Sequence, residues 1–124
     1  MFHAAIAGTG RAVPGKVLTN ADLEKLVDTS DEWITTRTGV RERHMAVDGE
    51  ALSDFCVAAA TQALENAGVA AKDLDAVLIA TVTPDQPIPA MACLVQQKLG
   101  AKKAAAWDQN AGCSGWLYGL HIAD

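Results

Sequence analysis

The sequence predicts an α/β domain with a largely parallel sheet, and three observations indicate this class. Short apolar runs with strand character alternate with longer segments of helical periodicity. The run Asp75–Thr83 is almost continuously apolar, as expected of a strand buried on both faces. Half of the 124 residues are hydrophobic, which is enough for one domain with its own core.

The first elements of the chain are expected to be short. His3–Ala7 is an apolar run that leads into the turn Gly-Thr-Gly, and we predict a buried strand there. Thr19 or Asn20 can serve as the N-cap of a short helix, because both side chains accept hydrogen bonds from free backbone N–H groups. This helix is predicted to continue through Leu26.

A second short helix is predicted from a capping box. Thr29 would be its N-cap and Glu32, three residues later, would complete the box. The helix should end before Gly39, because glycine is the residue that most readily adopts the left-handed conformation after a helix. The charged residues 40–44 that follow are expected to form an exposed strand or extended segment.

The remaining chain alternates regularly between helix and strand. The predicted elements are a helix from Ser53 to Gly68, the strand Asp75–Thr83, a helix Ala90–Leu99 closed by Gly100, a strand Ala104–Trp107 and a final helix from Trp116 to Asp124. Parallel strands joined through helices take right-handed crossovers, so the helices are expected to cover the sheet. The final helix has no stop signal, and we therefore expect the chain to be part of a larger fold.

Composition excludes several classes of protein. The net charge is −5 and no basic cluster is present, which argues against a nucleic-acid or membrane-surface partner. No apolar run approaches the roughly 20 residues needed to span a bilayer. The three cysteines, Cys56, Cys93 and Cys113, are odd in number and lack the spacing of metal ligands. We expect a reduced cytoplasmic protein without a disulfide framework, a metal site or a signal peptide.

The segment Gln109–Trp116, QNAGCSGW, is the strongest candidate for a reactive site. Cys113 lies between a predicted strand and a predicted helix, which would place it at the carboxyl edge of the sheet. The free N–H groups and the positive end of a helix dipole favour an ionised sulfur. The small neighbours would let a substrate carbonyl approach, and the N–H of Cys113 could then donate to an oxyanion. A packed cysteine at the start of a helix fits the same pattern.

A nucleophilic thiol also needs a base, and the chain offers none by spacing. His121 is eight residues after Cys113 and would lie about 12 Å further along the same helix, at 1.5 Å per residue. Neither His3 nor His44 is placed beside Cys113 by the sequence. Cys56 and Cys93 fall inside predicted helices, where packing is the simplest role for a cysteine.

Three segments resemble the N-terminal part of β-ketoacyl-acyl carrier protein synthase III. They are residues 20–44, 75–100 and 104–124, and they match in order and spacing over essentially the whole chain. The resemblance implies the thiolase fold, in which two βαβαβαββ halves form α-β-α-β-α layers. Residues 1–124 would be most of the first half, an N-terminal thiolase-like domain that is truncated and lacks the second half.

The family activity would be decarboxylative condensation at the start of type II fatty acid synthesis. The resemblance places the family's nucleophile on Cys113, which would take an acyl group, commonly acetyl, from coenzyme A. Malonyl-acyl carrier protein would then lose carbon dioxide, attack the acyl group and give a β-ketoacyl product. The histidine and asparagine of the family's triad would come from the missing half, so we expect the isolated chain to be inactive. The resemblance implies no cofactor besides the coenzyme A thioester substrate.

The resemblance also suggests binding residues. Thr29, Trp33 and Arg37 match the family's coenzyme A contacts, although a helix cap, a core anchor and a surface charge are the plain alternatives. Ile88 matches the residue that closes the acyl pocket across a homodimer. Straight-chain acetyl-specific members have phenylalanine there, which leaves the acyl preference open. The family dimerises through the strand that matches Ala104–Trp107.

Two other functions remain compatible with the sequence. A thiolase-fold condensing enzyme of a specialised pathway, of the polyketide or quinolone type, would share the cysteine and the fold. The chain could instead be a non-catalytic half that serves dimerisation or coenzyme A binding, because two members of the triad are not in it.

Overall fold

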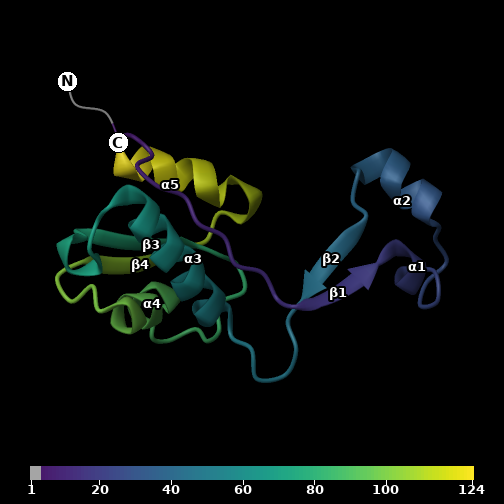
Figure 1. The fold of residues 1–124 in the computed structure, drawn as a ribbon, viewed down its shortest axis with the longest axis horizontal. Coiled ribbons are helices and arrows are strands. Elements are labelled where there is room, and N and C mark those ends of the chain that lie inside the picture. The colour runs from purple at the N-terminus through teal and green to yellow at the C-terminus, as the bar shows by residue number, and fades with distance from the viewer. Residues whose placement is uncertain (1–3) are drawn as a thin grey trace. The chain divides into compact units, whose positions relative to one another are not determined.

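The computed structural model describes residues 4–124, which divide into two compact units. The larger unit comprises the described residues up to Ala12 together with Ala51–Asp124, and the smaller unit is Val13–Glu50. Figure 1 shows the larger unit with α3, β3, α4, β4 and α5, and the smaller unit with β1, α1, α2 and β2. Each unit is described by itself.

The larger unit is a parallel sheet covered by helices. Its elements are α3 (Leu52–Ala67), β3 (Ala76–Ala80), α4 (Met91–Leu99), β4 (Ala105–Gln109) and α5 (Gly115–Ala123), with 3-10 turns at Ala71–Asp73 and Gly112–Ser114. Strands β3 and β4 are parallel, with Ala76 opposite Ala105 and Ala80 opposite Gln109. The predicted α/β class and parallel pairing are therefore confirmed.

Alternation along β3 separates the two helical layers. Val77 and Ile79 belong to the apolar cluster that includes Val95 of α4. Leu78 and Ala80 point to the opposite face, where α5 packs on them through Gly119 and Gly115. Figure 1 shows the result, with α4 and α5 on opposite sides of the sheet.

Helix α3 begins without a capping side chain of its own. Its N-cap residue is Ala51, and the carboxylate of Asp85 accepts hydrogen bonds from the N–H groups of Leu52 at 2.7 Å and Ser53 at 3.1 Å. The helix ends at Gly68, which has a φ of 66°, as the sequence predicts. Asp85 lies 33 residues after Leu52, so this cap comes from tertiary structure.

Helix α4 is capped in the same way. Its N-cap residue is Ala90, and Asp108 at the end of β4 accepts hydrogen bonds from the N–H groups of Met91 and Ala92, both at 2.7 Å. Met91 and Ala92 are fully buried, so water cannot replace this carboxylate. The predicted end at Gly100 is confirmed.

The smaller unit is a hairpin-like pair of strands with two short helices. Strands β1 (Lys16–Thr19) and β2 (Glu42–Met45) are antiparallel, with Lys16 opposite Met45 and Thr19 opposite Glu42. Helices α1 (Asn20–Leu23) and α2 (Asp31–Thr38) lie between them in the chain. The expected exposed strand after Gly39 is therefore confirmed, whereas its partner β1 was not predicted.

Asn20 organises the interior of this unit. It is 2% exposed, and its side-chain N–H groups donate to Asp31 at 2.6 Å and to the carbonyl of Val40 at 2.9 Å. Its side-chain oxygen accepts a hydrogen bond from Arg43. Hydrogen bonds from Asn20 and then Thr35 hold the pKa of Asp31 below its usual value. The buried amide thus joins α2 to β2.

The caps of the short helices differ in part from the prediction. Thr19 is the N-cap of α1, with a capping box completed by Asp22, but the helix ends at Leu23 instead of Leu26. The predicted role of Thr29 as N-cap of α2 is wrong. The side chain of Ser30 accepts the hydrogen bond from the N–H of Trp33 at 3.1 Å, because Ser30 has the extended conformation that a cap requires.

The strand predicted at His3–Ala7 is not found, although His3 itself lies outside the described residues. Ala4–Ala7 have no strand partner in residues 4–124, and an isolated extended segment is not a sheet strand. The chain instead passes close to α3. A Cβ at Gly8 would lie 2.2 Å from the carbonyl oxygen of Ala63, so only glycine fits there.

Candidate active site

Cys113 lies where the sequence predicts, at a strand-to-helix turn. Strand β4 ends at Gln109, the chain makes a 3-10 turn over Gly112–Ser114, and α5 begins at Gly115. Gly112 has a φ of 50°, a left-handed conformation that side chains disfavour, so glycine is needed immediately before the cysteine. The side chain of Cys113 is exposed.

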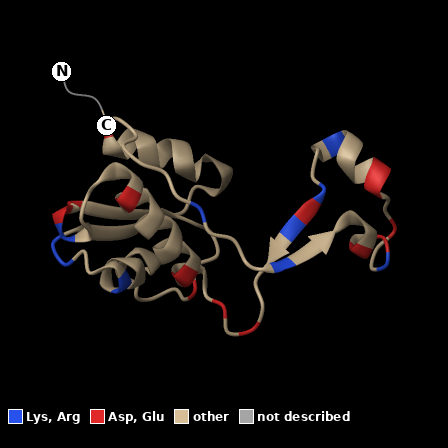
Figure 2. Ribbon diagram, in the orientation of Figure 1, with Lys and Arg blue, Asp and Glu red and all other residues tan. Residues whose placement is uncertain are grey.

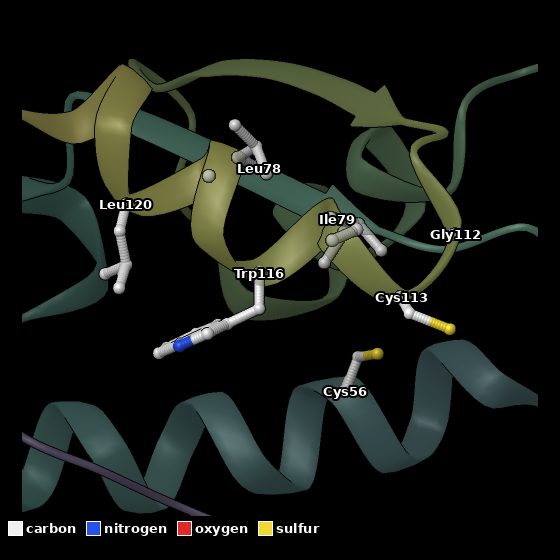
Figure 3. A pocket seen from close by; sticks show the side chains of 10 residues that line it. Cys56, Leu78, Ile79, Gly112, Cys113, Trp116 and Leu120 are labelled. Carbon is white, nitrogen blue, oxygen red and sulfur yellow. The ribbon is translucent and has the colours of Figure 1, made fainter.

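The thiol of Cys113 borders a cavity of about 530 Å³ in the larger unit. Its lining includes Cys56, Leu78, Ile79, Cys113, Trp116 and Leu120. Figure 3 shows the cavity between α5 and α3, with the sulfurs of Cys113 and Cys56 at the same end of it. The lining is mostly apolar, which suits an acyl chain better than a charged ligand.

Two glycines of α5, Gly115 at its start and Gly119 one turn later, have a packing role. A Cβ at Gly115 would lie 2.9 Å from the Cβ of Ala80 on β3, and one at Gly119 would lie 3.4 Å from Leu78. These glycines therefore let α5 lie close to the sheet. This close packing is what brings the start of α5, and Cys113 with it, to the carboxyl end of β3.

The three cysteines are in different environments. Cys113 is exposed, whereas Cys56 and Cys93 are half-buried. Burial, and then the negative charge of Asp85, raise the pKa of the Cys56 thiol. Cys93 lies 3.9 Å from the carbonyl oxygen of Ala106 and does not line the cavity. Cys56 packs against the apolar core cluster, as the sequence predicts, and it also forms part of the cavity wall.

Gln109 is a polar side chain beside the site that the sequence analysis did not single out. Its Nε2 group donates to the carbonyl of Gly115 at 3.3 Å, so it joins the end of β4 to the first residue of α5. Its buried Oε1 atom finds no hydrogen-bond donor among residues 4–124. The spacing of residues in the sequence could not predict this role of Gln109, because it depends on the conformation of the turn between β4 and α5.

No histidine lines the cavity next to Cys113 within residues 4–124. His121 lies in the last turn of α5 and borders a different cavity, together with Ala4, Ala5 and Ile6. The prediction that His121 is not the direct partner of Cys113 agrees with this placement.

The predicted coenzyme A residues lie in the smaller unit. Trp33 is 53% exposed, and the Arg37 guanidinium carbon is 4.6 Å from the centre of its ring. Thr29 and Trp33 line a cavity of about 420 Å³ together with Asp28 and Ser30. Thr29 and Trp33 thus lie at the start of α2, whereas Arg37 lies in its last turn, against the indole and outside the lining of the cavity.

Ile88, the predicted acyl-pocket residue, lies in the segment between β3 and α4. It is 86% exposed, the largest exposure among the large hydrophobic side chains of the described residues. Such exposure is unfavourable for an isoleucine in water, so this side chain is suited to contact with another chain or another part of the protein.

Comparison with known sequences shows which proteins the chain is similar to. No family model matches the chain. It is 57% identical over 120 residues to β-ketoacyl-acyl carrier protein synthase III of Geobacillus kaustophilus, which covers 97% of this chain and 39% of the relative. The corresponding protein of Thiobacillus denitrificans is 55% identical over 125 residues, covering 100% of this chain and 39% of the relative. The chain is therefore similar over nearly its whole length to the N-terminal part of β-ketoacyl-acyl carrier protein synthases III, and it spans about two fifths of the length of these relatives.

Solved structures give the same result for the fold. The synthase III of Aquifex aeolicus VF5 matches with a TM-score of 0.91 and 51% identity, covering 96% of this chain and 38% of that one. The priming β-ketosynthase of the R1128 polyketide pathway matches with a TM-score of 0.92 and 34% identity, covering 98% and 36%. The predicted thiolase-like fold is confirmed, and the chain spans less than two fifths of these two synthase structures.

Proposed function

We propose that the complete protein is a condensing acyltransferase of the synthase III type and that this chain provides its nucleophile. The observation that carries the proposal is the exposed thiol of Cys113, placed at the start of α5 on the border of an apolar cavity. The sulfur attacks the carbonyl carbon of an acyl-coenzyme A, and the coenzyme A thiolate leaves. The acyl group, most simply acetyl, is then held as a thioester on Cys113.

The second step uses the same sulfur as a leaving group. Malonyl-acyl carrier protein loses carbon dioxide, and the resulting carbanion attacks the carbonyl carbon on Cys113. The thiolate is released and the product is β-ketoacyl-acyl carrier protein. Both steps pass through an oxyanion, and backbone N–H groups at the start of α5 can donate to it. The chemistry needs no cofactor or metal.

The smaller unit would bind the adenine end of coenzyme A. The exposed face of Trp33 can stack on a purine, and the hydroxyl of Thr29 and the carboxylate of Asp28 can accept hydrogen bonds from its amino group. Arg37 already stacks on Trp33, so it can hold the base against the indole or bind a phosphate.

We propose further that the complete protein is a homodimer. Strand β4 pairs with β3 on one side, and its other edge has no strand partner within residues 4–124. Its short alanine-rich sequence suits pairing with a second copy better than exposure to water. Ile88 would then close the acyl pocket of the partner.

Residues 1–124 would form the N-terminal thiolase-like domain, and a second half would cover α5. This helix exposes Trp116, Leu117, Tyr118 and Ile122, although a helix with apolar residues around its whole circumference normally lies in a core. The second half would supply the histidine and asparagine that complete the triad, so the isolated chain should not catalyse condensation.

A specialised pathway is the second candidate. The R1128 priming β-ketosynthase is 34% identical, and the tetronic acid condensing enzyme AbyA1 is 30% identical with a TM-score of 0.84. Both proteins share the fold at this level of identity, so the starter group decides between the two functions. Turnover of acetyl-coenzyme A with malonyl-acyl carrier protein favours fatty acid synthesis, and turnover of only another starter favours a specialised pathway.

The location of the complete protein is proposed as cytoplasmic, where malonyl-acyl carrier protein would be available. Among residues 4–124, none of the helices has the length and apolar character needed to cross a membrane.

The direct test of the activity is the variant Cys113→Ala in the full-length protein. We expect its condensation rate to fall by roughly 10³-fold or more, because removal of a covalent nucleophile leaves only binding effects. Cys93→Ala is the matched control and should keep most of the activity. Equal activity of Cys113→Ala and wild type would contradict the proposal and favour a non-catalytic role for this domain.

A further inference from the structure

The segment between β3 and α4, residues 81–90, is held by one side chain near its centre. The carboxylate of Asp85 accepts hydrogen bonds from the N–H groups of Leu52 at 2.7 Å and Ser53 at 3.1 Å. The cap residue Ala51 has no acceptor in its side chain, so the start of α3 relies on Asp85. The segment itself contains no helix or strand, and Asp85 provides its hydrogen bonds to α3 within residues 4–124.

The surrounding charges favour the ionised form of Asp85. Burial alone would raise the pKa of this carboxyl group, but hydrogen bonds from Ser53 and Leu52 and the nearby charge of Lys98 lower it below its usual value. Lys98 donates to the hydroxyl of Ser53 at 2.8 Å and to Asp54 at 2.6 Å. The contact between the segment and α3 is therefore a charge-assisted cap at neutral pH.

The two elements joined by Asp85 both carry residues of the candidate acyl site. Cys56 lies one turn into α3 and forms part of the cavity wall beside Cys113, as Figure 3 shows. Ile88 lies three residues after Asp85 and is almost fully exposed. Movement of the segment against α3 would shift Ile88, the residue that would reach the acyl pocket of the second copy in the proposed homodimer.

We propose that Asp85 is a positioning residue for acyl-chain selection. By holding the 81–90 segment against the start of α3, it fixes the place of Ile88 relative to the helix that carries Cys56. This inference rests on the proposed function, because it assumes that the cavity beside Cys113 accepts the acyl group and that Ile88 of one copy closes this pocket in the other copy of the proposed homodimer. Asp85 itself does not touch the reacting atoms.

The test uses the full-length protein with Asp85→Ala and Asp85→Asn, and with Gly68→Ala as control. Gly68 has a φ of 66°, so alanine there strains the opposite end of α3 without touching the segment. Two quantities are measured: the amide exchange rates of Leu52, Ser53 and residues 81–90, and the ratio of kcat/KM for acetyl-coenzyme A to that for hexanoyl-coenzyme A.

In Asp85→Ala, exchange at Leu52 and Ser53 should rise by roughly tenfold relative to the rest of α3, because both N–H groups lose their acceptor. The kcat/KM ratio should change by roughly threefold or more. Asp85→Asn should give smaller changes, because the amide keeps one acceptor oxygen. Gly68→Ala should lower the melting temperature without changing the ratio.

Two results would overturn the inference. If exchange at Leu52 and Ser53 is unchanged in Asp85→Ala, the carboxylate does not anchor the segment. If Gly68→Ala changes the kcat/KM ratio as much as Asp85→Ala does, the effect reflects helix stability and not position. A wild-type protein that transfers no acyl group from coenzyme A would contradict the proposed function and the selection role with it. The exchange measurement would still show, independently of activity, whether Asp85 anchors the 81–90 segment to α3.

Discussion

The starts of α4 and α5 differ, although both helices follow a turn and pack on the same sheet. The first N–H groups of α4 donate to the carboxylate of Asp108. The start of α5 has no side-chain cap, and neither does the turn at Gly112–Ser114 before it. Figure 2 shows no acidic residue on the ribbon of α5 itself. The first N–H groups of α4 are therefore satisfied inside the core, whereas the N–H groups at the start of α5 have no side-chain acceptor and remain available to an anion.

The cap at the start of α4 contributes to stability, whereas the missing cap at the start of α5 favours reactivity of the nearby thiol. A carboxylate at a helix start satisfies N–H groups and the positive end of the dipole, and it leaves nothing for a thiolate or an oxyanion. Cys113 lies at the helix start that lacks one. The proposed nucleophile therefore lies at a helix start that has no stabilising side-chain cap.

The largest expected effect is on stability at α4. Asp108→Ala removes the acceptor of two buried N–H groups, and we expect a loss of about 3 kcal/mol in the free energy of unfolding, since each unsatisfied buried donor costs about 1–3 kcal/mol. Urea unfolding of the variant and wild type measures this. Asp108→Asn, which keeps an acceptor, should lose about half as much. A loss below about 0.5 kcal/mol in Asp108→Ala would show that the cap contributes little.

A smaller effect is expected if α5 receives a cap like that of α4. Ala111→Asp places a carboxylate immediately before the turn that contains Cys113. Its carboxylate competes for the free N–H groups at the start of α5 and repels the attacking thiolate, so alkylation of Cys113 by iodoacetamide should slow by roughly three- to tenfold. Ala111→Asn, of similar size and without charge, is the control. Equal rates in Ala111→Asp and wild type would contradict the contrast between the two helix starts.

The smallest effect is the pH dependence of the α3 cap. Because the pKa of Asp85 is lowered in the folded state, its contribution to stability is present above the unfolded value near 4 and is lost as the pH falls through the folded value. Stability should therefore decline below about pH 4 more steeply in wild type than in Asp85→Asn. Parallel curves for the two proteins would mean that Asp85 does not stabilise α3 through its charge.

The sequence predicts the elements of this fold better than the contacts between them. The spacing of apolar residues and the glycines at positions 68 and 100 were sufficient to place α3 and α4. Their caps could not be predicted, because Asp85 and Asp108 come from segments that are distant along the chain. The strand expected at His3–Ala7 needed a neighbour that a local pattern does not specify.

The candidate site was predictable to a similar extent. The strand, the small residues and the helix around Cys113 form a local pattern, and the structure reproduces it. The roles of Cys56 and Gln109 depend on how α3 and β4 are positioned against α5. The spacing of residues along the chain does not predict these tertiary contacts. Thr29 and Ser30 are adjacent and chemically similar, so only backbone conformation decides that Ser30 is the cap.

The most direct test of the central claim compares the three thiols of one molecule. Iodoacetamide at neutral pH, followed by peptide mapping over time, gives a separate rate for Cys56, Cys93 and Cys113. An exposed thiol at the uncapped start of α5 predicts that Cys113 reacts first, by roughly tenfold or more over the two half-buried thiols. If Cys113 reacts no faster than Cys56 or Cys93, the uncapped helix start does not activate it.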